Sequence, residues 1–328
     1  MNPPLLNAAQ RERACALPFR VGVDGGGTAT RVRLQDASGR TLGQGSAGPS
    51  GLSQGTAQAW QHVQQAVMAA FDAAGLPHQA APAVALGLGL AGAEVTTLRT
   101  DFLARNPGYA IGLLENDGIT QLAGAHAGGP GIVVSAGTGA VAAARFADGS
   151  VRRCGGWGWP AGDEGGGAWL GLQAVRTLQH ALDGRAPAGP LAAAVAAAIG
   201  PVAVAAEAAD ADAVAIAHAL QAWSVQAGQN ACAQLAPLVF AAAERGDMHA
   251  GALLQSAAAE LARLAEALTE ALGAPDSAAS HLPIVLNGSV GTRLALRWPP
   301  ALQARLVQPA GDSADGALLL LRLVLEAP

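Results

Sequence analysis

Apolar residues in the first 130 positions occur in short runs and in helically spaced sets, separated by glycine and polar residues. Runs and strict alternation predict strands, whereas apolar residues three or four positions apart predict helices. The predicted strands cover 19–23, 30–34, 41–44, 84–90 and 111–114, and the predicted helices cover 57–74, 95–104 and 118–127. Residues 1–18 show neither pattern, so we expect an irregular lead-in there.

The same order of elements starts again at residue 131. The pattern predicts strands at 131–135, 141–146 and 284–286, a glycine-rich loop at 155–167, and helices at 169–182, throughout the Ala- and Leu-rich stretch 186–274, and at 315–325. A strand, a glycine turn with a hydroxyl residue and a second strand therefore occur twice, at 20–34 and 131–146. Strands that alternate with helices predict an α/β fold, here with two similar halves facing one cleft.

Composition narrows the class of protein. The chain has 328 residues, 51% apolar and 13% charged, which is the balance of a folded protein of one large or two medium domains. A net charge of −5 without a basic block argues against a nucleic-acid partner. The chain contains no lysine, which excludes a Walker A loop.

Cysteine usage and hydropathy indicate the compartment. The three cysteines are far apart and form no CxxC pair, so we expect no disulfide framework, structural zinc or iron–sulfur cluster within the chain. The N-terminus lacks a signal-peptide pattern, and the most apolar window, 191–206, is interrupted by Gly200-Pro201. These features predict a cytoplasmic protein without a membrane span.

The first glycine turn, Asp24-Gly-Gly-Gly-Thr28, lies between two predicted strands. Consecutive glycines let backbone N–H groups approach an oxyanion closely, and Thr28 adds a hydroxyl donor. Asp24, at the strand end, can hold a hydrated Mg²⁺. The alternative is a plain hairpin turn, although a two-residue turn needs fewer glycines.

The second glycine turn, Ser135-Ala-Gly-Thr-Gly139, has the same character. Alone it is a weak signal, because many hairpins contain Gly-Thr-Gly. Together, two such turns on two halves predict a clamp around a polyphosphate.

Asp117 follows an apolar strand and precedes a predicted helix. A carboxylate in that position can act as the general base for an alcohol. Equally, an aspartate at the start of a helix can cap it by accepting a bond from a backbone N–H. Spacing alone leaves both interpretations open.

The loop 155–167 concentrates glycine around Asp163-Glu164 and two tryptophans. Such a loop suits a polar ligand: Asp163 can accept bonds from sugar hydroxyls while Trp157 or Trp159 packs on an apolar ring face. The alternative is that Asp163 or Glu164 caps the next helix and that the tryptophans belong to the core.

Taken together, these motifs resemble the sugar kinase–heat-shock protein–actin superfamily, and within it the N-acetylglucosamine kinase and BadF/BadG/BcrA/BcrD ATPase family. The two glycine turns resemble its phosphate motifs, and 286–290 lies where the family has its adenosine motif. The most specific part is Cys154-Gly-Gly-Trp-Gly158 followed by Gly162-Asp-Glu-Gly165, which is similar to the N-acetylglucosamine kinases.

The resemblance implies two actin-like (ribonuclease H-like) domains, 19–122 with 310–328 and 123–309, flanking an interdomain ATP cleft. Asp24 would orient Mg²⁺ through water, Asp117 would take the proton from the sugar 6-hydroxyl, and the sugar would be bound by Asp117, Gly156, Trp157 and Asp163. The ATP site would comprise Asp24, Gly25, Gly26, Gly27, Thr28, Gly137, Thr138, Gly139, Gly288 and Ser289.

One position departs from the family pattern. Gly51 stands where the family usually has a sugar-binding asparagine, and Ser50, Ser53 or a water could substitute for it. The resemblance as a whole implies a homodimeric kinase acting on the 6-hydroxyl of an amino sugar. N-acetylglucosamine is the first expected substrate, and glucosamine is the alternative because of the departure at Gly51. A further alternative is a nucleotide-dependent ATPase of this family that acts on a protein partner.

Overall fold

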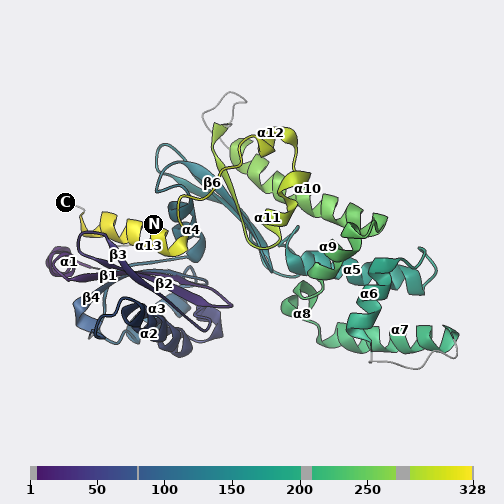
Figure 1. Ribbon diagram of the computed structural model, residues 1–328, viewed down its shortest axis with the longest axis horizontal. Helices are drawn as coiled ribbons and strands as arrows, with labels where there is room; N and C mark the ends of the chain where they lie inside the picture. Colours follow the sequence, from purple (N-terminus) through teal and green to yellow (C-terminus); the bar gives the residue numbers. More distant parts are fainter. Residues whose placement is uncertain (1–5, 80, 201–208, 271–280, 327–328) are drawn as a thin grey trace. The chain divides into compact units, whose positions relative to one another are not determined.

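A computed structural model describes residues 6–79, 81–200, 209–270 and 281–326 (Figure 1). The chain forms two compact units. The first comprises Met1–Gly131, Arg145–Ser150 and Gln308–Pro328, and the second comprises Ile132–Ala144 and Val151–Val307. Both combine a β-sheet with helices, so the predicted α/β class is confirmed.

The first unit is built on a five-stranded mixed sheet in the order β3-β2-β1-β4-β5. Its strands are β1 (Phe19–Gly25), β2 (Thr30–Asp36), β3 (Thr41–Ala47), β4 (Val84–Leu90) and β5 (Ala110–Glu115). Strand β1 pairs antiparallel with β2 and parallel with β4, and β4 pairs parallel with β5. All five strands lie where the apolar pattern predicts them.

Helices cover both faces of this sheet. They are α2 (Thr56–Ala73), α3 (Thr96–Ala104), α4 (Asp117–Ala125) and α13 (Ser313–Leu325). Val21 and Val23 of β1 are fully buried in a core shared with α2, whereas Gly22 between them faces α13, where a Cβ would lie 2.1 Å from the Ala314 carbonyl oxygen. Because side chains alternate along a strand, the sequence of β1 places α2 and α13 on opposite faces.

The N-terminal segment corrects one expectation. Residues predicted to be irregular form helix α1 (Ala8–Cys15), which begins with a capping box between Asn7 and Gln10. Ala14 is buried against Leu321 and Leu325 of α13. The helix was missed because it is short and mostly polar, and only one residue of it enters a core.

The second unit contains a four-stranded sheet in the order β8-β7-β6-β9. Its strands are β6 (Gly131–Ala136), β7 (Ala140–Arg145), β8 (Val151–Gly155) and β9 (Ile284–Asn287). Strand β6 pairs parallel with β9 as β1 does with β4, so the predicted likeness of the two halves is confirmed at the level of strand order. Strand β8 was not predicted, because two exposed arginines interrupt its apolar pattern.

Helices make up most of the second unit. They are α5 (Gly167–Leu182), α6 (Pro190–Ile199), α7 (Ala209–Gln226), α8 (Gln229–Ala233), α9 (Ala236–Glu244), α10 (Met248–Glu270), α11 (Gly291–Leu294) and α12 (Pro300–Gln303). The Ala- and Leu-rich stretch is therefore helical, as predicted, in its described residues; 201–208 and 271–274 lie outside them. Across the part of the chain that the structure describes, no helix has the length and apolarity needed to cross a membrane.

Candidate active site

The first glycine turn connects β1 to β2 in the first unit. Gly25 is required by packing, since a Cβ there would lie 2.2 Å from the Ser50 hydroxyl oxygen. Gly26, in contrast, faces open space, with no heavy atom within 4 Å of a Cβ position. Packing therefore does not explain the glycine at 26, whereas close approach by an anion does. The turn joins two adjacent antiparallel strands and is therefore also a hairpin turn, so the open position of Gly26 is what favours anion binding.

The carbonyl groups of this turn are held from one side. The Gly26 oxygen accepts bonds from the backbone N–H groups of Ser50 and Gly51, at 3.2 and 3.0 Å, and the Gln54 side chain donates to the Gly27 oxygen at 2.9 Å. Within the described residues, the N–H groups of Gly27 and Thr28 donate to no protein acceptor. The turn thus keeps backbone donors available for an anionic ligand. Its contact with Gln54 had no signal in the sequence.

Asp24 is the second-last residue of β1, and its side chain is 24% exposed. Burial raises the pKa of its carboxyl group, the Ser313 hydroxyl and Arg31 lower it, and Asp312 raises it again. The Arg31 guanidinium lies 3.8 Å away. Mg²⁺ keeps most of its waters and needs only one or two carboxylates. A half-buried carboxylate beside an open anion-binding turn therefore fits the predicted magnesium role.

Asp117 is the first residue of α4, in the same unit. The N-cap of this helix is Asn116, whose side chain accepts from the Gly118 N–H at 2.9 Å. Asn116 is therefore the N-cap, and the Asp117 carboxylate also accepts a bond from the Gly118 N–H, at 3.0 Å. Burial raises the pKa of Asp117 to about 6, with further contributions from the charges of Asp24 and Glu94. A carboxylate whose pKa lies near neutrality is suited to general-base work.

Glu94 is a residue of this site that the motifs did not identify. It follows β4, and its carboxylate accepts a bond of 2.7 Å from the Asn116 side chain. The contact joins the end of β4 to the start of α4. It therefore fixes the residue next to Asp117 and places a second negative charge near the Asp117 carboxylate.

The second glycine turn connects β6 to β7 in the second unit. Its carbonyl groups are held by the first turn of α5: the Gly167 N–H donates to the Gly137 oxygen at 2.7 Å and the Ala168 N–H to the Thr138 oxygen at 2.9 Å. Gly137 faces open space, with no heavy atom within 4 Å of a Cβ position. As in the first unit, the carbonyls are fixed and the glycine surface stays open.

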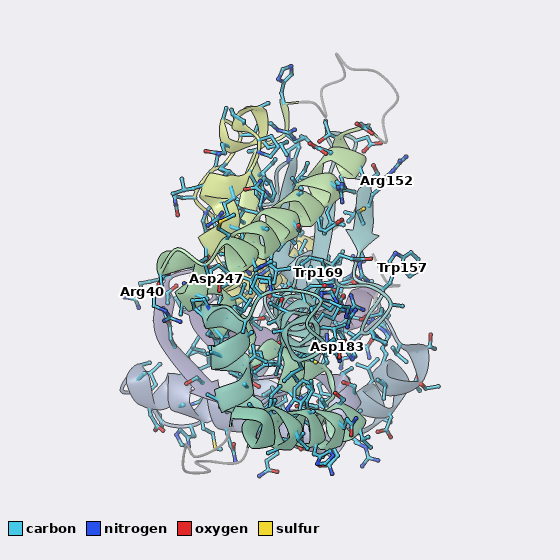
Figure 2. The ribbon with its side chains drawn as sticks, turned by 90° about the vertical axis from the view of Figure 1, so that its right-hand side faces the viewer. Arg40, Arg152, Trp157, Trp169, Asp183 and Asp247 are labelled. Atoms are coloured by element: carbon cyan, nitrogen blue, oxygen red, sulfur yellow. The ribbon has the colours of Figure 1, made fainter. Side chains whose placement is uncertain are left out.

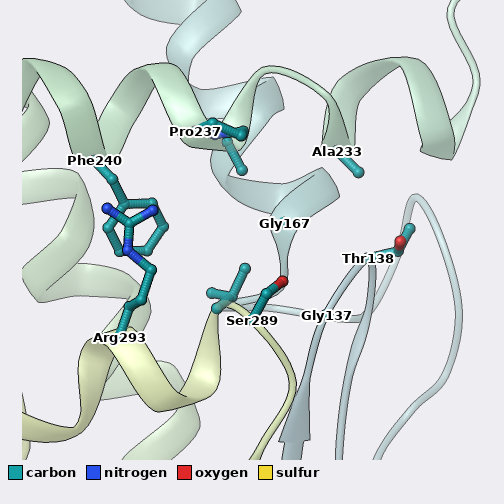
Figure 3. A pocket seen from close by; sticks show the side chains of 10 residues that line it. Gly137, Thr138, Gly167, Ala233, Pro237, Phe240, Ser289 and Arg293 are labelled. Atoms are coloured by element: carbon teal, nitrogen blue, oxygen red, sulfur yellow. The ribbon is translucent and has the colours of Figure 1, made fainter.

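A cavity of about 190 Å³ opens beside this turn (Figure 3). Predicted residues Gly137, Thr138 and Ser289 line it, together with Gly167 and Val290 from the predicted motif segments. The motifs did not include the remaining lining residues: Ala233, Ala236, Pro237, Phe240 and Arg293. The Arg293 guanidinium stacks 3.8 Å from the centre of the Phe240 ring. A cavity with an aromatic ring and an arginine at one end and a glycine turn at the other suits a nucleotide.

Gly288 supports this cavity without lining it. Its φ angle is +83°, and a Cβ there would lie 2.3 Å from the Ala136 carbonyl oxygen. Only glycine satisfies both constraints. The Asn-Gly-Ser segment after β9 therefore packs directly on the second glycine turn.

The glycine-rich loop of the second unit buries Asp163 and exposes Trp157. Asp163 is 7% exposed and has a φ angle of +64°, a strained conformation for a residue other than glycine. The N-cap of α5 is Gly166 without a side-chain bond, so capping by Asp163 or Glu164 is wrong. Trp157 is 87% exposed and projects into solvent (Figure 2), so its assignment to the core is wrong too.

The segment around Gly51 lies against the first glycine turn. Ser50 is fully buried and accepts a bond of 2.7 Å from the Thr30 hydroxyl, so its own hydroxyl is occupied inside the protein. Of the two serines proposed to replace the missing asparagine, only the exposed Ser53 remains available.

The predicted site residues thus form two sets, one in each unit. Asp24, the first glycine turn and Asp117 belong to the first unit. The second glycine turn, the loop with Gly156 and Asp163, and Ser289 belong to the second.

Comparison with known proteins identifies the family. The model of the BadF/BadG/BcrA/BcrD ATPase family matches residues 21–312, nearly the whole chain. The chain belongs to this family. The match includes both glycine turns, Asp117, the loop with Asp163 and the segment after β9.

Relatives of this family member include two amino-sugar kinases. Glucosamine kinase GspK of Vibrio cholerae serotype O1 is 30% identical over 301 residues, which cover 92% of this chain and 95% of that protein. The N-acetylmuramic acid/N-acetylglucosamine kinase of Clostridium acetobutylicum is 30% identical over 173 residues, covering 52% of this chain and 56% of the relative.

A solved structure extends the comparison to three dimensions. A Chromobacterium violaceum protein assigned as an N-acetylglucosamine kinase is 43% identical and has a TM-score of 0.81, covering 93% of this chain and 99% of its own. A Porphyromonas gingivalis structure at 19% identity and a TM-score of 0.60 shares the fold.

Proposed function

We propose that this family member transfers the terminal phosphoryl group of ATP to the 6-hydroxyl of an amino sugar, with N-acetylglucosamine as first substrate and glucosamine as second. The observation that carries the proposal is Asp117, a half-buried carboxylate with a pKa near 6 beside Asp24 and its open glycine turn. The similarity to two amino-sugar kinases supports the substrate class.

In this proposal the glycine turns of both units bind the phosphates of ATP, and the cavity beside Arg293 and Phe240 takes the nucleoside. Asp24 holds the hydrated Mg²⁺, which supplies positive charge to the phosphates when bound. Asp117 accepts the proton of the attacking hydroxyl. Gly156, Trp157 and Asp163 contact the sugar. Positioning and charge neutralisation do most of the catalysis in phosphoryl transfer. The donors and carboxylates of this arrangement would supply both.

We propose that the residue sets of both units act on the same ATP and sugar. Exclusion of water from the bound substrates would limit wasteful hydrolysis of ATP. We also propose a cytoplasmic homodimer as the working form, which light scattering of the purified protein tests.

The direct test is ADP release from Mg-ATP, measured against N-acetylglucosamine, glucosamine, N-acetylmannosamine, glucose and N-acetylmuramate, with the product's phosphate located by ³¹P-coupled NMR. Strong stimulation by one amino sugar and a 6-phosphate product support the proposal. Chelation of the metal should abolish turnover, and Asp117→Asn should abolish it in a protein that still binds ADP.

Two results would overturn the proposal. Near-normal turnover of Asp117→Asn would remove Asp117 as the base. ADP release that no sugar changes would favour the ATPase that acts on a protein partner.

A further inference from the structure

The Ala-rich helical region contributes a polar side chain to the loop with Asp163. Gln229, the first residue of α8, donates a hydrogen bond of 3.0 Å from Nε2 to the Asp163 Oδ2 atom. The two residues are 66 positions apart in sequence. Within the described parts of the chain, no other side chain donates a hydrogen bond to the Asp163 carboxylate.

Asp163 has little freedom to move away from this contact. Its backbone oxygen accepts from the Gly166 N–H at 3.0 Å, and its φ angle is +64°. On another side the carboxylate abuts the second glycine turn, where a Cβ on Gly139 would lie 2.4 Å from Oδ2. The Gln229 bond therefore holds the carboxylate through Oδ2, and no hydrogen bond from the described residues reaches Oδ1.

Helix α8 is itself fixed and lies against the nucleotide cavity. It packs on α5 so closely that a Cβ on Gly171 would lie 1.8 Å from the Cys232 carbonyl oxygen. Ala233, which lines the cavity, is four residues after Gln229. Residues four apart share one face of a helix. A single helical turn thus joins the side chain that holds Asp163 to the cavity wall.

We propose that Gln229 is a positioning residue that orients the Asp163 carboxylate for the sugar and couples sugar binding to occupancy of the nucleotide cavity through α8. The proposal rests on the proposed function, in which Asp163 contacts the sugar. Gln229 itself touches neither the reacting atoms nor the phosphates.

The test compares Gln229→Leu and Gln229→Glu with the wild-type protein. The first variant removes the donor at similar size, and the second puts a like charge beside Asp163. Gln234→Leu is the matched control, because Gln234 ends the same helix with an exposed side chain. Steady-state kinetics give KM and kcat for the preferred sugar, and calorimetry gives the sugar's Kd with and without ADP.

We expect both Gln229 variants to raise the sugar KM about tenfold or more, since a bond to a charged group is lost. We expect kcat and the Kd for ADP alone to change less than about threefold, because the glycine turn and cavity stay intact. The effect of ADP on sugar affinity should shrink toward none in both variants, whereas Gln234→Leu should behave as wild type.

The outcomes separate this proposal from the function on which it rests. A wild-type protein that neither binds nor phosphorylates any amino sugar overturns the proposed function, and the role of Gln229 with it. An active wild type with unchanged sugar KM in Gln229→Leu overturns the Gln229 proposal alone. If Gln229→Leu weakens sugar binding, ADP binding and thermal stability together, the contact is purely structural, and this result would also overturn the Gln229 proposal.

Discussion

The Thr120 and Ser313 hydroxyl groups lie 2.8 Å apart in the interior of the first unit, although 193 positions separate them in sequence. Thr120 also bonds the Asp117 backbone oxygen at 3.0 Å, and the Ser313 hydroxyl lowers the pKa of Asp24. A buried pair of hydroxyls thus connects the backbone of one acidic residue with the carboxylate of the other. It also joins α4 to α13.

We therefore expect Thr120→Val to lower kcat/KM about three- to tenfold and the free energy of unfolding by about 1–2 kcal/mol, because a buried bond is lost while the shape is kept. Thr120→Ser should restore most of both. The control is Thr100→Val on the exposed side of α3. Unchanged kinetics in Thr120→Val, measured by coupled ADP release, would show that the hydroxyl pair does not support the site.

The charge of Glu94 should contribute to the position of the acid limb of the pH profile. Burial is the largest cause that raises the pKa of Asp117 to about 6, and Asp24 and Glu94 raise it further. A general base must be ionised, so activity should fall as pH drops through about 6. Glu94→Gln removes one like charge and keeps an acceptor for Asn116, so the midpoint should move to lower pH by a few tenths of a unit, on the order expected for an exposed charge.

The measurement is kcat/KM between pH 5 and 9 at low salt. Glu12→Gln, on the exposed surface of α1, is the matched control and should leave the midpoint in place. A shift of the midpoint to higher pH in Glu94→Gln would contradict the electrostatic argument.

Ionisation of Asp117 should lower the free energy of unfolding. Its pKa is about 6 in the folded protein and about 4 in the unfolded chain, so the folded state favours the protonated form. The stabilisation that comes from protonating Asp117 in the folded state is fully present below pH 4 and is lost as pH rises through 6. We expect Asp117→Asn to be inactive yet more stable by on the order of 1–2 kcal/mol at pH 8, after solvent screening is allowed for. Urea unfolding at pH 4 and pH 8 checks this, since the gain should almost vanish at pH 4.

The parts of the site that the sequence predicts are those carried by local pattern. Apolar runs specify β1, β4 and β6, and the runs of β1 and β6 lead directly into the two glycine turns. Asp117 could be placed after β5 for the same reason. In these cases the residues that define a feature lie within a few positions of one another.

The parts that the sequence does not predict depend on distant or weak signals. The partner of Asp163 is Gln229, in an alanine-rich region whose helices look alike in sequence. Strand β8 carries exposed arginines, since an edge strand has little apolar surface to bury. The pairing of Thr120 with Ser313 requires α13 to return to the first unit, which no local pattern encodes.

Asp247 should stabilise the helical part of the second unit. It is 7% exposed, and its carboxylate accepts bonds from the Leu191 N–H of α6 at 2.8 Å and the Ala250 N–H of α10 at 3.0 Å (Figure 2). Burial raises the pKa of Asp247, but these backbone bonds outweigh it and lower the pKa. Asp247→Ala should cost about 1–3 kcal/mol at neutral pH.

Thermal and urea unfolding test this against Asp183→Ala, which removes an exposed carboxylate paired with Arg185 and should change stability by less than about 0.5 kcal/mol. Because the pKa of Asp247 is lowered in the folded protein, its contribution is present above about pH 4 and is lost as pH falls further. An equal effect of the two substitutions would show that the shared cap of α6 and α10 carries no special stability.

Gly51 provides a direct test of sugar specificity. Its φ angle is −60°, and a Cβ there would meet nothing closer than 3.5 Å, so a Cβ is accommodated without backbone strain. The bond from its N–H to Gly26 is retained by any residue except proline.

In the proposed function, Gly51→Asn restores an amide that can bond the sugar and should lower the sugar KM about two- to tenfold. The ratio of kcat/KM for N-acetylglucosamine to that for glucosamine should change in the Gly51→Asn variant but not in the Gly51→Ala control. If both variants keep the wild-type ratio, this position does not face the sugar, and specificity must then depend on residues of the second unit such as Asp163.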